Sequence, residues 1–503
     1  MMGSGVALFD YDNDGDLDLY FVQGGNVTTS RGDLHDQLCR NEGLDPTKQK
    51  VFWKDVSRDA GLAITHDYGM GIAVADVNQD GWLDVYLTNF GPNRLLINKN
   101  GRFVDETERW QAGEGRWSVS ASFVDYDSDG DMDLFVANYV DYSLTRHKTC
   151  RNVNGEPDYC SPKSYNPVPD RLLRNDGDHF TDVTGQAGIA KHYGNGLGVI
   201  AGDFNGDGWP DIYVANDGVP NQMWLNRGNG KFIDDGMLSG TAVNGAGMAE
   251  ASMGVVAEDF DNDGDLDLFM THLTRETNTL YVNDGQGWFS DKTAVLQLAG
   301  QSLPYTGFGT VWKDFNGDNL PDIFVANGAV TLIPEQVRAG IVPPLKQRNQ
   351  LFIATKGVYV EQKTYATSLR SELAVGRGVA AGDIDNDGDI DLVINNNDGA
   401  PTLLINRTNP KHWLGLAPRR EPGKPVVAGV QAVIQWKNKR IVRRTYRDGS
   451  YASSHDPRIV VALPDGRKPE KIELVWPNGT RQVLTEIQTN QYQDIFKPKG
   501  KAK

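Results

Sequence analysis

Seven short acidic segments with the same spacing recur along this chain. Each follows the pattern D-x-[DN]-x-D-[GN]-x-x-D, and they begin at residues 10, 76, 125, 203, 259, 314 and 383. Alternate carboxylates on a tight loop bring their oxygen atoms together, and Ca²⁺ takes about six to eight oxygen ligands. The pattern therefore predicts one calcium site in each segment, up to seven in the whole chain.

The predicted ligands are the side chains at positions 1, 3, 5 and 9 of each segment, with a further aspartate at position 7 of four segments. By segment they are Asp10, Asp12, Asp14, Asp16 and Asp18; Asp76, Asn78, Asp80 and Asp84; Asp125, Asp127, Asp129, Asp131 and Asp133; Asp203, Asn205, Asp207 and Asp211; Asp259, Asp261, Asp263, Asp265 and Asp267; Asp314, Asn316, Asp318 and Asp322; and Asp383, Asp385, Asp387, Asp389 and Asp391. Position 6 is glycine in six segments and Asn319 in the sixth. Asparagine tolerates the left-handed backbone that this position requires, so we expect the sixth site to be kept.

The segments alternate in charge. The first, third, fifth and seventh carry Asp at positions 3 and 7, whereas the second, fourth and sixth carry Asn at position 3 and Trp or Leu at position 7. Crowded carboxylates repel one another, so we expect the odd-numbered segments to depend more on metal. The alternative is that these acidic residues only cap turns. Zinc is disfavoured because the segments contain neither His nor Cys.

Each acidic segment sits in the same local context, which indicates how it is positioned. A short apolar run such as GVIAG precedes it, a β-rich run such as IYVAN follows it, and a hairpin such as QMWLNRGNGKFIDD comes next. One repeat is therefore about four short strands, with the acidic loop joining the first two. Such units repeated radially are the blades of a β-propeller. We predict an all-β protein with a seven-bladed propeller over residues 1–408 and a small β-sandwich over 409–503.

The charge of the chain is unevenly distributed. The 503 residues carry a formal net charge of −17, but residues 407–503 hold 20 Lys and Arg against 8 Asp and Glu. That tail is basic, and the rest is strongly acidic, which argues against coating a nucleic acid. The cluster of Arg443, Arg444 and Arg447 could dock on the acidic propeller, or it could be a solvated basic face. No stretch is apolar for long enough to predict a transmembrane helix.

The cysteines and the N-terminus bear on the compartment. Cys150 and Cys160 lie ten residues apart in a segment rich in Gly, Pro and Asn. A disulfide would staple that segment in an exported protein, and two free thiols are the alternative. The first residues, MMGSGVALFDYD, are not a signal peptide and lead almost directly into a strand-like run, as though something upstream were missing.

The acidic segments resemble the FG-GAP, or VCBS, repeats of integrin-α-type propellers. The tail from about Asn409 resembles the ASPIC/UnbV domain through HWLGL, VAGVQAVIQW, GSYASSHDP, IVVALPDG and KIELVWPNG. This resemblance implies a calcium-stabilised propeller in an extracellular, periplasmic or cell-surface protein. It departs from the family in having only LVINN and PTLLINR after Asp391, so the last blade is expected to lack its outer strand.

The resemblance implies a non-catalytic binding or scaffold protein whose propeller face presents a protein or glycan partner site. The alternatives are a calcium-dependent enzyme acting on polysaccharide and a lectin. The eight histidines form no recognisable catalytic constellation, and no GxSxG, HExxH or P-loop motif occurs. We therefore expect no enzymatic activity.

Overall fold

The structure, a computed structural model, is built almost entirely of short strands. It describes residues 2–25, 27, 35–45, 50–62, 67–151, 155, 157–332, 338–340, 345–363 and 373–498. Its helices are single turns at the surface: α1 (Thr184–Ala187), α2 (Gly236–Ser239), α3 (Ala299–Ser302), and the 3-10 turns η1 (Leu144–Arg146), η2 (Pro162–Ser164) and η3 (Ile189–Lys191). The predicted all-β class is confirmed. Among the described residues, no helix has the length and apolar character needed to cross a membrane.

In the described residues up to 404, seven antiparallel sheets of three or four strands follow one another along the chain, apart from a two-stranded ribbon in one insertion. Six have four strands, and the seventh has three. The strands are β1 (Val6–Phe9), β2 (Asp18–Phe21), β3 (Gln37–Asp45) and β4 (Lys50–Asp55); β5 (Tyr68–Ala75), β6 (Asp84–Phe90), β7 (Arg94–Asn98) and β8 (Phe103–Asp105); β9 (Ser118–Val124), β10 (Asp133–Asn138), β13 (Arg171–Asn175) and β14 (Phe180–Asp182); β15 (Gly196–Gly202), β16 (Asp211–Asn216), β17 (Gln222–Asn226) and β18 (Phe232–Asp234); β19 (Val255–Glu258), β20 (Asp267–Met270), β21 (Thr279–Asn283) and β22 (Phe289–Asp291); β23 (Gly307–Lys313), β24 (Asp322–Asn327), β25 (Gln350–Thr355) and β26 (Val358–Glu361); and β27 (Gly376–Gly382), β28 (Asp391–Asn396) and β29 (Thr402–Leu404).

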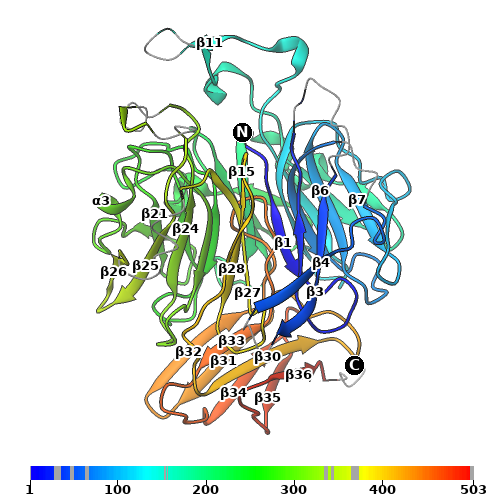
Figure 1. Cartoon of the computed structure of the whole chain (residues 1–503), viewed down its shortest axis with the longest axis vertical. Helices are drawn as coiled ribbons and strands as arrows, with labels where there is room; N and C mark the ends of the chain where they lie inside the picture. Colours follow the sequence, from blue (N-terminus) through cyan, green and yellow to red (C-terminus); the bar gives the residue numbers. More distant parts are fainter. Residues whose placement is uncertain are drawn as a thin grey trace.

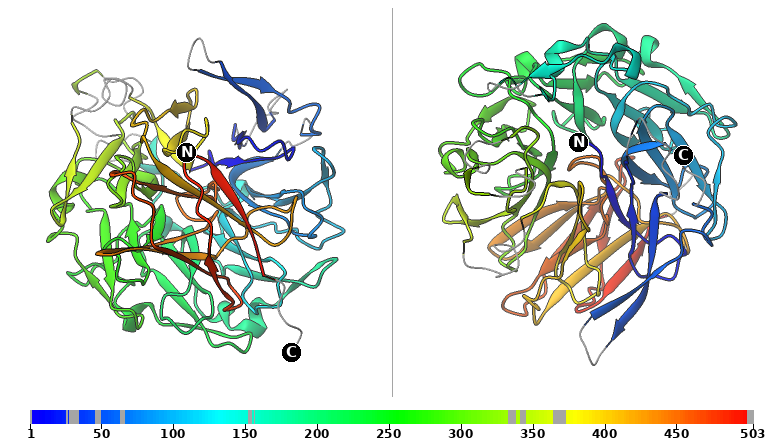
Figure 2. Two further views of the ribbon diagram at one scale, coloured as in Figure 1. Left: turned by 90° about the horizontal axis from the view of Figure 1, so that it is seen from below. Right: turned by 45° about the horizontal axis from the view of Figure 1, so that its top comes forward.

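The sheets form a closed ring. Their first strands contact one another in cyclic order, from β1 through β5, β9, β15, β19, β23 and β27 back to β1. Figure 2 shows the sheets arranged around a common axis. The second strands, such as β10, β16 and β24, are buried along their whole length, which explains why they read as apolar runs without polar alternation. The arrangement is that of a β-propeller.

The seventh sheet lacks an outer strand in the described residues, as the short sequence after Asp391 led us to expect. Its third and last strand, β29, packs instead near β3 and β4 of the first sheet. Leu403 and Ile405 belong to the same apolar cluster as Val51 and Trp53 of β4. The first and last sheets therefore meet along an apolar seam as well as at their inner strands.

The longest insertion lies between β10 and β13, on the face of the ring where the N-terminus lies (Figure 1). It contains the two-stranded ribbon of β11 (Cys150–Arg151) and β12 (Pro157–Asp158). Cys150 and Cys160 form a disulfide across this ribbon, which confirms the predicted staple. Cys39 is free.

The C-terminal domain consists of two sheets around one apolar cluster, as predicted for a small sandwich. One sheet has the order β33-β30-β36 and the other β32-β31-β34-β35. The strands are β30 (Trp413–Arg419), β31 (Gln431–Trp436), β32 (Lys439–Arg444), β33 (Ile459–Ala462), β34 (Lys471–Val475), β35 (Arg481–Leu484) and β36 (Tyr492–Phe496). Figure 1 places this domain, in orange to red, below the ring and opposite the disulfide ribbon.

Candidate metal centres

The seven acidic loops lie on one face of the ring. Each joins the first strand of a sheet to its second, as the loop between β1 and β2 does. The first strands run in the same sense, so their ends gather on the face that carries the C-terminal domain (Figure 1). The loops are therefore where the repeat pattern predicted them.

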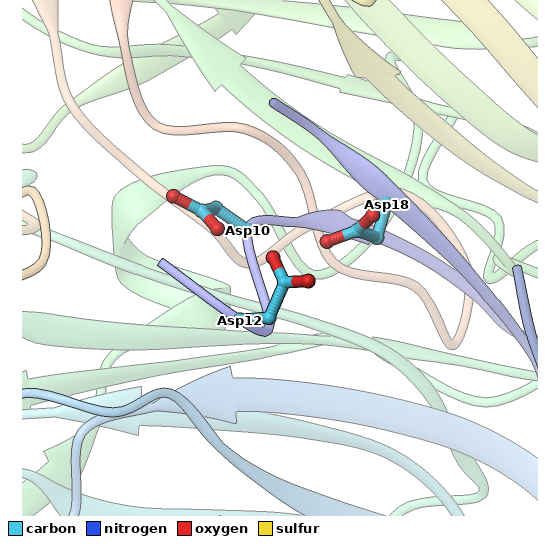
Figure 3. A group of neighbouring side chains, drawn as sticks. All are labelled: Asp10, Asp12 and Asp18. Atoms are coloured by element: carbon cyan, nitrogen blue, oxygen red, sulfur yellow. The ribbon is translucent and has the colours of Figure 1, made fainter. Parts of the chain in front are cut away.

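Three carboxylates converge in each of four loops. One ligand oxygen from every member lies within 4.8 Å of the others. The groups are Asp10, Asp12 and Asp18; Asp125, Asp127 and Asp133; Asp259, Asp261 and Asp263; and Asp383, Asp385 and Asp391. Figure 3 shows the first group, in which Asp10 and Asp12 extend from the loop and Asp18 from the strand that follows it. All four groups belong to the odd-numbered loops, which carry a carboxylate at position 3.

Several oxygens in these groups are buried without a hydrogen-bond partner. They are Oδ1 of Asp12, Asp125, Asp127 and Asp385 and both carboxylate oxygens of Asp259. Asp259 is 2% exposed, and the Asp385 side chain is 1% exposed. A buried polar atom without a partner costs free energy, and a bound cation would supply that partner. The donor set consists of oxygen atoms alone, which fits Ca²⁺.

Other carboxylate oxygens hold the loop backbone in shape. At position 9, Asp18 Oδ2 accepts a hydrogen bond from Tyr11 N at 3.0 Å, and Asp18 Oδ1 accepts one from Asn41 N at 2.8 Å. The same two bonds recur in all seven loops. At position 5, Asp14 Oδ1 accepts a bond from Asp16 N at 2.9 Å. The acidic residues therefore cap turns, as the alternative hypothesis held, and the odd loops have additional oxygens left over.

Position 6 has the backbone that the sequence required. Gly81 has a φ of 102°, and Asn319, the one residue other than glycine at this position, has a φ of 67°. The Asn319 N–H donates to Asp314 Oδ2 at 2.7 Å, just as Gly81 N donates to Asp76 Oδ2 at 3.0 Å. The sixth loop therefore keeps the geometry of the others.

The aspartates at position 7 lie outside the four groups of three. Asp16 Oδ1 accepts a bond from Asn386 of the seventh loop at 3.0 Å, and Asp131 accepts one from Gln79 of the second. Asp389 Oδ2 accepts a bond from Asn409 N at 2.9 Å. These three side chains link a loop to its neighbour or to the C-terminal domain, and their role as metal ligands stays a prediction.

Burial shifts the ionisation of the loop carboxyls. It raises the pKa of Asp18 to about 8 and that of Asp133 to about 9, although backbone N–H groups oppose the shift. The pKa of Asp259 is raised to about 7, first by burial and then by the neighbouring Glu258. Charged carboxylates are thus unfavourable in these loops unless a cation lies beside them.

The even-numbered loops replace the third carboxylate with an amide. Asn78 Nδ2 donates to Asp80 Oδ2 at 3.0 Å, and Asn205 and Asn316 make the equivalent bond to position 5 at 3.1 and 3.2 Å. The amide thus partners a carboxylate oxygen from inside the loop. Asp76 Oδ1 still lacks a partner.

Cations of the C-terminal domain donate to backbone carbonyls of these loops and of a strand beside them. Arg443 donates to the Asn319 carbonyl at 2.8 Å, Arg458 to the Asp383 carbonyl at 2.9 Å, and Lys424 to the Gln79 carbonyl at 2.6 Å. Arg444 donates to the Ala201 carbonyl at 3.0 Å. The predicted docking of the basic domain on the acidic propeller is confirmed, and it uses loop carbonyls more than carboxylates.

A segment between β32 and β33 passes from the C-terminal domain into the centre of the ring. Ala452 accepts a bond from Ile72 N of β5 at 3.1 Å, Ser454 accepts one from Leu8 N of β1 at 3.1 Å, and Ser450 accepts one from Val255 N of β19 at 3.0 Å. This insertion was not predicted from the sequence. The run GSYASSHDP was its signal, because small residues are needed where backbones meet so closely.

The family models identify both parts of the chain. One described as FG-GAP-like repeat matches residues 10–87, 76–136, 152–214, 203–270 and 259–325, more than half of the chain. The chain belongs to this FG-GAP-like repeat family. A second model, described as ASPIC and UnbV, matches residues 424–502. Both resemblances expected from the sequence are confirmed.

Several named proteins are similar to this FG-GAP-like repeat protein. Cartilage acidic protein 1 of Mus musculus is 23% identical over 540 residues, covering 99% of this chain and 74% of the relative. The Homo sapiens protein of the same name is 23% identical, covering 94% and 69%. Among solved structures, the BP39L lectin of Burkholderia pseudomallei has a TM-score of 0.44 at 12% identity, covering 80% of this chain and 95% of the lectin. An Agrocybe aegerita lectin has a TM-score of 0.36 at 16% identity, covering 71% and 79%.

A recurring asparagine ties neighbouring FG-GAP-like repeats together. Asn226 N donates to Asp211 Oδ1 of its own loop at 2.8 Å, while Asn226 Nδ2 donates to the Tyr126 carbonyl of the preceding loop at 2.7 Å. The equivalent residues, here called the inter-repeat asparagines, are Asn41, Asn98, Asn175, Asn226, Asn283 and Asn406. The sixth sheet has Ala354 at this position. The asparagine before the turn, as in LLRNDG, was the signal in the sequence.

Proposed function

We propose that this FG-GAP-like repeat protein is a calcium-binding, non-catalytic binding or scaffold protein. The observation that carries the proposal is the convergence of three carboxylates in alternate loops, with buried oxygens that have no partner. Bound Ca²⁺ would neutralise this charge and fix each loop between its two strands. Up to seven ions would bind, one in each loop.

Calcium would also prepare the face on which the C-terminal domain docks. Arg443 and Lys424 bond to backbone carbonyls of the loops, so their contacts depend on the loop backbone being held in place. The acidic face is thereby occupied within the molecule. A protein or carbohydrate partner would then bind the opposite face or the outer rim of the ring.

We further propose that the protein works outside the reducing cytosol. The disulfide between Cys150 and Cys160 supports this location, because such bonds persist in oxidising compartments. The small ribbon that it closes has few buried residues of its own, so the bond would stabilise the ribbon.

A serine and a histidine of the fifth sheet are in contact, as they are in many hydrolase active sites. Ser252 Oγ lies 2.9 Å from His272 Nε2, as a nucleophile lies beside its base. Both residues are buried, at 0% and 2% exposure, and Ser118 bonds to Asn138 in the same way at the end of the third sheet's inner strands. A buried pair that replaces a structural Ser–Asn pair supports a structural role, so we propose no enzymatic activity.

Calcium titration of the chelator-treated protein tests the proposal. Ca²⁺ should raise the melting temperature and bind with a stoichiometry between four and seven, whereas Mg²⁺ at equal concentration should have a smaller effect. Elemental analysis of the purified protein supplies the stoichiometry independently. Fewer than two bound calcium ions, or an unchanged melting temperature, would contradict the proposal.

A further inference from the structure

A pocket on the rim of the fourth sheet lies far from the acidic loops in the repeat. Its volume is about 310 Å³, and its walls come from the turn after η3, the β16–β17 turn and helix α2. Tyr193, Met237 and Leu238 form an apolar lip and are 56%, 67% and 68% exposed. The floor is polar and contains Gln222 and Asp234. Pockets that combine apolar walls with a few convergent polar groups are typical of ligand sites.

The equivalent position in two other sheets is filled by an arginine of the chain itself. In the second sheet, Arg94 at the start of β7 donates to Asp105 Oδ2 at the end of β8, at 2.9 Å. In the third sheet, Arg171 at the start of β13 donates to Asp182 Oδ2 at the end of β14, at 2.9 Å. Each arginine therefore covers the carboxylate that ends the outer strand of its own sheet.

The fourth sheet keeps the carboxylate but not the arginine. The strand register places Gln222 where the other sheets have Arg94 and Arg171, and Asp234 where they have Asp105 and Asp182. The other oxygen of this aspartate makes the same bond in both sheets. Asp182 Oδ1 accepts a hydrogen bond from Thr184 N at 3.0 Å, and Asp234 Oδ1 accepts one from Gly236 N at 3.2 Å. The substitution to glutamine thus removes only the cation.

The groups left behind lack the partners that their equivalents have. Gln222 is 4% exposed, and its Nε2 atom has no hydrogen-bond partner. Asp234 Oδ2 has His192 Nδ1 at 3.8 Å, beyond hydrogen-bond distance. Burial raises the pKa of Asp234, although the Gly236 N–H, His192 and the Gln222 side chain oppose the shift. For Asp182, burial is outweighed by bonds from Thr184 and Arg171, which lower the pKa.

We propose that this pocket binds an arginine side chain presented by a partner protein. The guanidinium would take the position that Arg94 and Arg171 occupy in their own sheets and pair with Asp234 Oδ2. The aliphatic part of the side chain would lie against Met237 and Leu238. The residues up to 406 are strongly acidic, so a basic partner is favoured by the surrounding field as well. This inference rests on the proposed function as a binding protein and names one contact of its partner.

The test uses N-acetyl-arginine amide and its neutral isostere, N-acetyl-citrulline amide, as probes of the full chain with calcium at low ionic strength. Saturation-transfer NMR measures the affinity of each. We expect the arginine probe to bind at least tenfold more tightly than the citrulline probe. Asp234→Asn should weaken the arginine probe at least tenfold, while the matched control Asp105→Asn, whose carboxyl is already paired with Arg94, should change it less than twofold.

A second variant fills the pocket from within. Gln222→Arg restores the residue type found in the second and third sheets and keeps Asp234, so it should abolish probe binding without loss of stability. This variant keeps the test decisive if Asp234→Asn does not fold. Equal binding of the two probes, or equal effects of Asp234→Asn and Asp105→Asn, would overturn the proposal, as would probe binding that survives Gln222→Arg.

The melting temperature with and without calcium is measured on the same samples. If calcium stabilises the protein and the arginine probe does not bind, only this inference fails. If calcium has no effect, the proposed function fails whatever the probe does. Loss of self-association in Asp234→Asn, measured by sedimentation, would show that a second copy of the chain occupies the pocket and would overturn the assignment to a different protein.

Discussion

The odd-numbered and even-numbered acidic loops share one backbone and differ in how their charge is balanced. In both classes the position 9 aspartate accepts two backbone N–H groups, as Asp133 does in the third loop and Asp211 in the fourth. In the first, third and seventh loops the position 3 aspartate joins those at positions 1 and 9, and one of its oxygens has no partner, as in Asp127. In the fifth loop the group is Asp259, Asp261 and Asp263, and the oxygens without a partner are those of Asp259. In the even loops Asn205 and its equivalents donate to a carboxylate from inside the loop.

The difference shows that the acidic pattern has two roles: it holds the loop backbone by hydrogen bonds, and it leaves negative charge that a cation could neutralise. The aspartates at positions 5 and 9 hold the loop backbone in every repeat, and the aspartate at position 1 does so in all loops but the fifth, where both oxygens of Asp259 lack a partner. The residue at position 3 decides how much uncompensated charge remains. A ring that alternates the two kinds of loop would therefore be held partly by its own hydrogen bonds and partly by metal.

Removing calcium should have the largest effect. Each site that binds only the folded chain contributes about 2.7 kcal/mol when free calcium is at a hundredfold excess over Kd. Four odd loops would together contribute several times this amount, so a chelator should cause a large fall in the free energy of unfolding. Chemical denaturation with calcium and with chelator measures it. A loss equal to a single site would break the comparison, because the odd loops would then not act as a class.

The stabilisation by calcium should grow with pH. Burial raises the pKa of Asp18 to about 8 and of Asp391 to about 9, from an unfolded value near 3.8. Between those limits the metal-free folded chain holds more protons than the unfolded chain, so its stability falls as pH rises. Calcium must displace these protons, and its contribution should therefore be small near pH 4.5 and large near pH 8. Melting curves with and without calcium at both pH values test the sign, and a contribution that shrinks with pH would contradict it.

The inter-repeat asparagines should matter equally beside both kinds of loop. Asn98→Ala removes a bond to the first loop, and Asn175→Ala removes one to the second. Each leaves a buried carbonyl without its partner, at a cost of about 1–3 kcal/mol. The cost should be the same with calcium and with chelator, as measured by denaturation. A loss seen only with calcium would mean that these residues act through the metal sites.

Exchanging the position 3 residue between odd and even loops should have the smallest effect on stability, but it should change calcium affinity and metal-free stability in opposite directions. Asp127→Asn should weaken calcium binding by about tenfold, or 1.4 kcal/mol, and should stabilise the metal-free protein by removing a crowded charge. Asn205→Asp should do the reverse in the fourth loop. Calorimetry of calcium binding and denaturation in chelator measure the two effects. If both variants move stability in the same direction, position 3 does not distinguish the classes.

The sequence was most informative where one residue type acts locally. The position 6 glycines predicted a left-handed turn, and Asn319 adopts it as expected. The repeated strand–loop–strand context predicted the sheets, and the shortened end predicted the three-stranded seventh sheet. The position 7 aspartates were predicted as additional ligands of the odd loops, whereas the structure places Asp16, Asp131 and Asp389 toward neighbouring loops or the C-terminal domain.

Contacts between distant parts of the chain could not be predicted in the same way. Asn226 reaches a carbonyl 100 residues earlier. The hairpin pattern aligns Gln222 with Arg94, but the sequence does not show that a pocket is lined at that position. The small residues of GSYASSHDP indicate a close approach of two backbones, but they do not indicate which strands the segment approaches. Such contacts depend on the closure of the ring, which is a property of the whole fold.

The segment of the C-terminal domain that enters the ring connects the inner strands of several sheets to one another. Leu8, Ile72 and Val255, on three different inner strands, each donate a backbone N–H to it. A protein truncated before this segment would leave the N–H groups of Leu8, Ile72 and Val255 without these hydrogen-bond acceptors. The propeller and the C-terminal domain, although they differ in sequence and in the sign of their charge, are therefore expected to unfold in one transition. Cleavage of the chain near residue 409 is expected to leave the two domains associated.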